Sequence, residues 1–173
     1  IISNLDQVSY GILLWRALLQ WLGGIGIIVM AVAILPMLSI GGMQLFKTES
    51  YETPDKIIPR AAIFASGISI VYIFLTSIWA FMLWLAGMPI FDSITHAMTT
   101  LATGGYSTKS ESLGAFNSVN IEMIIVFGMI VGSLPFIHYL SILKNGWKNL
   151  INDQQVKWFL LILFFLISIV SFN

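Results

Sequence analysis

The 173-residue chain lacks cysteine altogether, which excludes disulfide bonds and cysteine-based metal sites within it. It also has little charge, since Asp, Glu, Lys and Arg make up only 9% of its residues, whereas a soluble domain has about 25%. Hydrophobic residues account for 58%, and the mean hydropathy is +0.92, which together indicate a membrane protein. Eight basic and eight acidic residues cancel, so the net charge gives no reason to expect a nucleic-acid partner.

The sequence also lacks the side-chain groupings that enzymes use. There is no Ser/His/Asp set, no pair of carboxylates across a predicted pocket and no cluster of metal ligands. We therefore expect neither catalysis nor a bound cofactor. His96 has no second ligand nearby, which favours packing or a hydrogen bond over a metal site. His138, near the end of an apolar run, is either a membrane-interface residue or a gating or proton-transfer group.

Neither end of the chain has the pattern of a natural terminus. It starts with Ile1, and no charged region followed by a short apolar core and a cleavage site is present there. The last apolar run, Trp158–Phe172, is too short as a helix for the ~30 Å hydrocarbon core. We expect an internal fragment of a longer polytopic protein.

Three apolar runs have the length of membrane spans, for which about 20 residues are needed. They are Gly11–Leu38, Ala61–Ala86 and Ile121–Leu143. Pro135 should kink the third run, because proline removes a helical hydrogen bond and crowds the preceding turn. The glycines of Gly23–Gly26 have the spacing of part of a dinucleotide loop, but no strand precedes them. Close helix packing through small residues is the favoured interpretation.

A shorter apolar stretch, Pro89–Ser107, lies between the second and third runs. It is too short to cross a bilayer, so we expect a re-entrant helix over Asp92–Leu101 that is capped by Asp92 or Ser93. The irregular run Thr103–Thr108 follows it. Such backbone survives at membrane depth only where protein buries it or water reaches it. A half-crossing helix with a Thr/Gly loop is therefore a candidate pore element, and the negative helix end favours a cation there.

Two polar connectors separate these elements and predict the orientation. Residues Ser39–Arg60 and Lys144–Lys157 lie on the same side, because two crossings separate them. They hold most of the basic residues, which marks them as cytoplasmic by the positive-inside rule. The re-entrant loop then opens to the outside. The basic residues of the connectors are Lys47, Lys56, Arg60, Lys144, Lys148 and Lys157.

Polar residues near the predicted outer side each allow two interpretations. Arg16 and Gln20 either line an ion path or, for Arg16, snorkel to the membrane surface. Glu122 either attracts cations or caps its helix in contact with solvent.

Two long strings, LLWRALLQWLGGIGIIVMAVAILPMLSIGGMQL (Leu13–Leu45) and HAMTTLATGGYSTKSESLGAFNS (His96–Ser118), resemble the Trk/Ktr/HKT superfamily of potassium transporters, and within it the bacterial TrkH potassium-uptake subunits. The resemblance covers essentially the whole chain. It implies an all-α integral membrane fold in which four M1–P–M2 repeats, like those of potassium channels, surround one pore. The implied segments are 1–38 (end of the first repeat, M2), 39–60 (cytoplasmic connector), 61–143 (complete second repeat), 144–157 (connector) and 158–173 (start of the third repeat, M1).

The resemblance also implies a selectivity filter in each repeat, which maps here to Ala102, Thr103, Gly104 and Gly105. Gly104 would stand in the filter and Gly105 would turn the chain. We expect glycine there because it accepts backbone angles that other residues resist. Potassium would be the transported substrate, with no other metal bound. The loose match of Thr-Gly-Gly-Tyr to a potassium-channel filter implies weaker discrimination against sodium.

The implied function is potassium uptake across the bacterial inner membrane by a multi-pass, channel-like protein that contacts lipid. The family further implies a homodimer of the full-length protein and a cytoplasmic nucleotide-binding regulatory ring as partner. Two other functions stay open. One is a secondary cation symporter with broken helices, and the other is a non-conducting membrane scaffold, for which Gly104 would be freely replaceable.

Overall fold

The computed structural model describes residues 4–38, 54–145 and 153–171. Within these ranges the chain forms helices and turns without any β-strand, which confirms the all-α prediction. The chain divides into two compact units, Ile1–Ser133 and Leu134–Asn173. The predicted connectors 39–60 and 144–157 lie partly outside the described residues, namely at 39–53 and 146–152.

Two long helices of the first unit correspond to the first two predicted spans. Helix α1 covers Tyr10–Leu38 and α2 covers Pro54–Leu85. Windows of both are long and apolar enough to cross a membrane. Helix α2 begins before the predicted Ala61, within the polar connector. Proline is compatible with such a start, because the N–H groups of a first helical turn have no partner within the helix.

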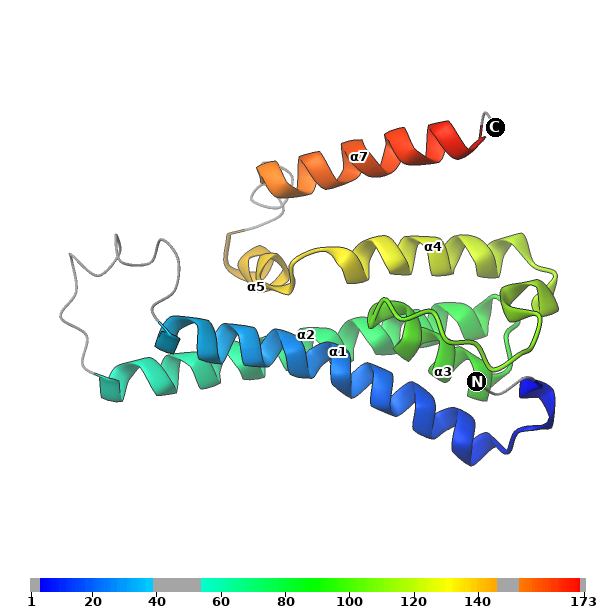
Figure 1. Cartoon of the computed structure of the whole chain (residues 1–173), viewed down its shortest axis with the longest axis horizontal. Coiled ribbons are helices and arrows are strands. Elements are labelled where there is room, and N and C mark those ends of the chain that lie inside the picture. Colours follow the sequence, from blue (N-terminus) through cyan, green and yellow to red (C-terminus); the bar gives the residue numbers. More distant parts are fainter. Residues whose placement is uncertain (1–3, 39–53, 146–152, 172–173) are drawn as a thin grey trace. The chain divides into compact units, whose positions relative to one another are not determined.

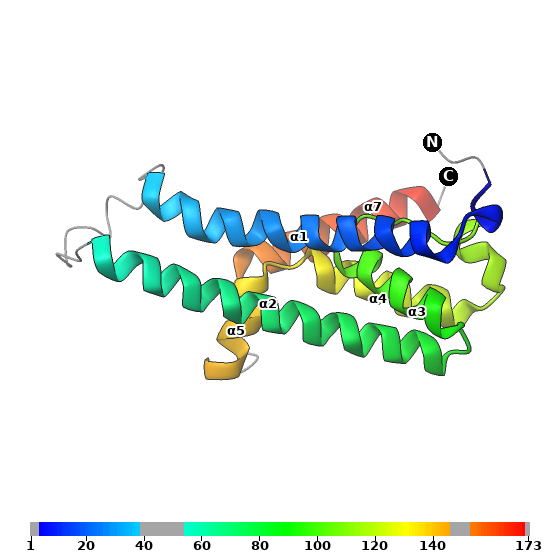
Figure 2. The same ribbon diagram turned by 90° about the horizontal axis from the view of Figure 1, so that it is seen from below.

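The short helix α3, Ile90–Leu101, packs against α1, α2 and α4, as the two views in Figures 1 and 2 show. Nine of its 12 residues are buried, although several of them are polar. A buried short helix surrounded by longer apolar ones is the arrangement that the Pro89–Ser107 stretch predicts.

The capping prediction for α3 is wrong. The helix begins at Ile90, two residues earlier than expected, with Pro89 at the N-cap and no side-chain cap hydrogen bond. The Ser93 hydroxyl instead donates to the carbonyls of Met88 and Pro89, 3.1 and 3.0 Å away. Asp92 lies inside the first turn, where its charge is still favourable to the helix dipole, but its carboxylate binds Thr108.

Helix α4, Val119–Ser133, approaches α3 through two glycines one turn apart, Gly128 and Gly132. A Cβ at Gly132 would lie 2.8 Å from the Leu101 carbonyl oxygen, and one at Gly128 would lie 2.7 Å from the Thr100 methyl carbon. Small residues at this spacing let two helix backbones come close together. The Trp79 indole on α2 also donates to the Ile124 carbonyl of α4, at 2.9 Å.

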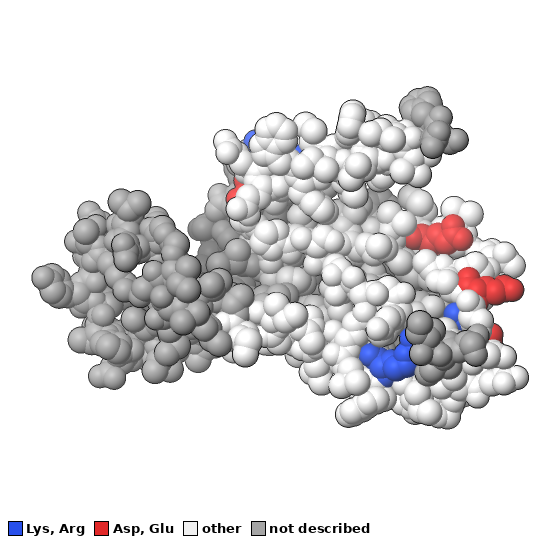
Figure 3. All heavy atoms as spheres, in the orientation of Figure 1, with Lys and Arg blue, Asp and Glu red and all other residues white. Residues whose placement is uncertain are grey.

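A small apolar core lies where these helices meet. It joins Leu83 and Met88 around the end of α2, Ala97 on α3, and Ile121 and Ile125 on α4. Many large apolar side chains elsewhere on these helices are exposed. In the view of Figure 3, the described charged side chains of the first unit gather at one end, and most of the other described surface on this face is uncharged. Such a surface is compatible with hydrocarbon. Among the described residues, this unit also contains the 3₁₀ helices η1 (Leu5–Gln7) and η3 (Ser112–Phe116).

The predicted kink at Pro135 is confirmed as an interruption. Helix α4 ends at Ser133 and α5, Phe136–Asn145, starts after the proline. The second unit contains α5 and α7, which covers Gln154–Ser171. Helix α7 begins before the predicted Trp158, because the Asp153 carboxylate caps it by accepting from the N–H groups of residues 155 and 156. In the same unit, His138 Nε2 lies 3.5 Å from Asp153 Oδ2.

Candidate functional site

The loop that follows α3 begins as a Schellman motif. The Thr103 N–H donates to the Thr100 carbonyl and the Gly104 N–H donates to the Thr99 carbonyl, both at 2.9 Å. This pair of bonds satisfies carbonyls that the helix end would leave unpaired. The Gly105 N–H adds a longer bond of 3.4 Å to the same Thr99 carbonyl. Three consecutive N–H groups of the loop are therefore directed at α3.

Backbone handedness alternates along these residues and corrects one prediction. Thr103 and Gly105 have φ of +54° and +72°, whereas Gly104 is outside the left-handed region. Gly105 thus turns the chain as predicted. Gly104 does not need glycine for its backbone angle, so that part of the prediction is wrong. Its constraint is space, because a Cβ there would overlap the Gln20 side chain of α1.

Sequence reasoning named Thr103 as a filter residue but missed its left-handed backbone conformation. A left-handed conformation costs an L-residue roughly 1–2 kcal/mol, and it is rare for β-branched side chains. Glycine is the usual residue at this position of a Schellman motif, so a threonine gave no signal of the turn. Strain of this kind concentrates at functional sites, where the surrounding contacts maintain it.

After its turn, the loop that follows α3 runs back along one polar face of this helix. Its three side chains occur at residues 92, 96 and 99, a spacing that puts them on the same side of a helix. Each contacts one residue of the loop, in antiparallel order. The contacts are Thr99 hydroxyl to Tyr106 carbonyl (2.9 Å), His96 Nε2 with Ser107 Oγ (3.1 Å), and Thr108 hydroxyl to Asp92 Oδ1 (2.6 Å).

These contacts are buried and explain the polar residues of a short apolar helix. Asp92, His96 and Thr108 are each no more than 5% exposed. His96 Nδ1 lies 2.8 Å from the Asp92 carbonyl, and its ring meets Phe116 edge-on. The interpretation of His96 as a hydrogen-bonding residue is confirmed. The spacing of Asp92, His96 and Thr99 was the signal in the sequence for these three contacts, which together form a ladder between α3 and the loop.

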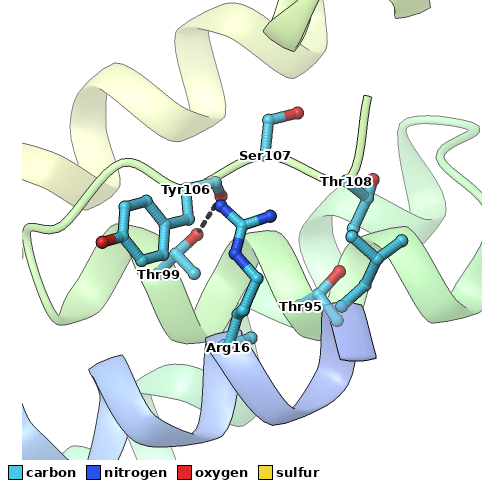
Figure 4. Close-up of a pocket in the computed structure, with 8 residues that line it drawn as sticks. Arg16, Thr95, Thr99, Tyr106, Ser107 and Thr108 are labelled. Carbon is cyan, nitrogen blue, oxygen red and sulfur yellow. Dashed lines mark hydrogen bonds between the residues drawn. The ribbon is translucent and has the colours of Figure 1, made fainter. Parts of the chain in front are cut away.

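Helix α1 contacts the opposite side of the loop. The Arg16 guanidinium lies 4.8 Å from the centre of the Tyr106 ring, a cation–π distance. In Figure 4 the guanidinium points at the loop, beside a cavity of about 10 Å³ that Thr95, Thr99 and Thr108 help to line. Its Nη1 atom is buried. The Arg16 side chain as a whole is only partly buried, so both of its interpretations stay open.

The predicted filter residues are close together but not equivalent. Thr103, Gly104 and Gly105 line a hollow of about 340 Å³, together with residues of η3 and α4. Ala102 instead lies against α1, where its Cβ would be 3.3 Å from a Cβ at Gly24. Glu122 is exposed in the first turn of α4, so both of its interpretations stay open.

The whole chain, residues 1–173, matches the family model of TrkH, which is described as a cation transport protein. The chain belongs to the TrkH family. Among relatives of this TrkH family member, the Trk system potassium uptake protein TrkI of Halomonas elongata is 42% identical over 96% of the chain. The Trk system potassium uptake protein TrkH of Escherichia coli K12 is 40% identical over 96%. The chain spans 34% and 35% of the lengths of these two proteins.

The fold of this TrkH family member also matches a solved structure. The crystal structure of the potassium transporter TrkH from Vibrio parahaemolyticus superposes with a TM-score of 0.79, at 37% sequence identity. The match covers 96% of this chain and 34% of that chain. The all-α architecture is therefore that of a membrane transporter fold.

Proposed function

We propose that the chain forms part of a channel-like pore for potassium uptake, with Ala102–Gly105 as its filter strand. The observation that carries this proposal is the direction of the peptide groups. The N–H groups of Thr103, Gly104 and Gly105 donate to carbonyls of α3. In a planar trans peptide the preceding carbonyl points the opposite way. The carbonyls of Ala102, Thr103 and Gly104 thus point together, away from α3.

Consecutive carbonyls on one side of a strand are the ligands that a dehydrated potassium ion needs. In potassium channels, rings of backbone carbonyls replace the hydration shell of the ion. The strand also follows the carbonyl end of α3, where the helix dipole stabilises positive charge. One strand supplies only part of a ring, so the remaining carbonyls would come from the other repeats of the full-length protein.

The helix order supports an M1–P–M2 repeat embedded in the bacterial inner membrane. Helix α2 corresponds to M1, α3 to the pore helix, and α4 with α5 to a broken M2. Helix α1 is then the M2 of the preceding repeat, and α7 starts the M1 of the next one. The relatives are named for potassium uptake, which supports transport rather than catalysis.

The partners of the full-length protein are also proposals. Its relatives are named as parts of a Trk system. A homodimer and a cytoplasmic nucleotide-binding ring fit that description, and the connectors 39–60 and 144–157 are the segments that would face the ring. Lipid would cover the exposed apolar faces of the helices.

Passive flux separates the channel from the two other functions. Full-length protein in liposomes should carry potassium down its own gradient, with neither a sodium nor a proton gradient present. The measurement is rubidium or potassium uptake against empty liposomes. A symporter would need the gradient of its co-ion, and a scaffold would give no flux at all, so either of those results would replace the channel proposal.

The topology is tested by cysteine labelling. With other cysteines of the full-length protein replaced, Glu111→Cys should react with an impermeant reagent from outside the cell, because it follows the re-entrant loop. Lys157→Cys, at the exposed last residue of the second connector, should react only from the cytoplasmic side. If residue 111 is labelled from the cytoplasmic side alone, the predicted orientation in the membrane is wrong.

A further inference from the structure

We propose that Gln20 of α1 is a positioning residue for the filter strand, and this proposal rests on the proposed function above. Gln20 belongs to the helix that precedes the α2–α3–α4 repeat, so the contact joins two successive repeats. A Cβ built on Gly104 would overlap the Gln20 amide and would lie 2.7 Å from its Cγ. The side chain of Gln20 therefore occupies the side-chain space of Gly104.

The length of the Gln20 side chain, and not a hydrogen bond from its amide oxygen, accounts for its place against Gly104. Gln20 Oε1 is buried and has no hydrogen-bond partner among the residues that the structure describes. Such an atom retains the desolvation penalty of a buried acceptor. An apolar side chain of similar length would avoid this penalty while filling the same space. The contact with Gly104 accounts for the presence of a long side chain at position 20.

The strand is held between two helices. On one side, the ladder from Asp92, His96 and Thr99 fixes the loop to α3. On the other side, α1 meets the loop at two points one turn apart, with Gln20 against Gly104 and Arg16 against the Tyr106 ring. Removing the Gln20 contact would leave a gap behind Gly104, so the carbonyls beside it could shift. Discrimination between ions depends on the placement of such carbonyls.

The first test compares two replacements of Gln20 in the full-length protein. Gln20→Ala should lower the potassium/sodium permeability ratio about tenfold, whereas Gln20→Met should keep it near the wild-type value, because methionine has a similar length and fills irregular gaps. Gln155→Ala, at an exposed position of α7, is the matched control and should change nothing. Equal ratios for Gln20→Ala and wild type would overturn the proposal.

The second test is a rescue. Gly104→Ala alone should abolish selective uptake, because its methyl group meets Gln20. The double variant Gly104→Ala/Gln20→Ala should recover to the level of Gln20→Ala alone, since the space is then free. This non-additivity is what a double-mutant cycle measures for residues in contact. Protein amount in the membrane is measured in parallel, so that poor expression is not read as lost transport.

The two possible failures of this rescue are distinguishable. If Gly104→Ala abolishes uptake and the double variant does not recover, Gly104 belongs to the filter but Gln20 does not position it. If Gly104→Ala leaves uptake and the permeability ratio unchanged, the Gln20 side chain moves aside without effect on the filter, and the positioning proposal fails. The proposed function fails separately, if the liposomes show no passive potassium flux.

Discussion

In the full-length protein, Gly104→Ser is expected to abolish growth at low potassium in a strain that lacks its own potassium uptake. A serine side chain has no room, because the Gln20 side chain occupies the Cβ position. Either Gln20 leaves or the strand shifts, and overpacking of this kind costs about 1–3 kcal/mol. A loss of about 1.4 kcal/mol in potassium preference would lower the potassium/sodium permeability ratio about tenfold. Growth and the permeability ratio are measured together.

Gly114→Ser provides the matched control for this substitution. Gly114 lies in η3, and a Cβ there meets nothing within 4 Å. Its φ is outside the left-handed region, so serine should be accepted with little effect. If both variants grow equally well with an unchanged ratio, Gly104 does not belong to the filter.

Gly132→Ala is expected to disrupt folding of the full-length protein and, with it, uptake. The added methyl would lie 2.8 Å from the Leu101 carbonyl oxygen and 3.2 Å from the Leu101 carbonyl carbon and Cα. These are backbone atoms at the end of α3, so they cannot rotate away as a side chain can. Helix α4 would have to move away from α3, which weakens the support of the filter strand. The expected cost is about 1–3 kcal/mol, seen as a lower melting temperature in detergent.

Gly23→Ala makes the same chemical change inside α1, where a Cβ meets nothing within 4 Å in this chain. Alanine is a better helix former than glycine by about 0.5–1 kcal/mol. The control variant should therefore be as stable as the wild type or slightly more so. A Gly132→Ala protein with an unchanged melting temperature would show that α4 does not pack tightly on α3.

Helix positions were largely predictable, but helix starts were not. The length of the apolar runs predicted α1 and α2, and Pro135 predicted the break after α4. Both signals depend only on residues that are close together in the sequence. Helices α2 and α7 begin earlier than the hydrophobic pattern indicates, and α3 begins before its predicted capping residues. Polar residues and prolines take part in first helical turns, where backbone N–H groups have no helical partner. Hydrophobicity therefore does not mark these starts.

The sequence alone determined that this is a membrane protein, that a short helix lies between longer ones, and that its Thr-Gly-Gly loop is the candidate site. These follow from composition, run length and two long family-like strings. Only the tertiary structure decided what constrains each loop residue. Gly105 turns the chain as predicted, Thr103 adds a left-handed conformation that was not predicted, and Gly104 needs glycine for space. The space beside Gly104 is limited by Gln20, which is 84 positions away in the chain. A contact between such distant residues depends on how α1 packs against the loop, which a local sequence pattern does not specify.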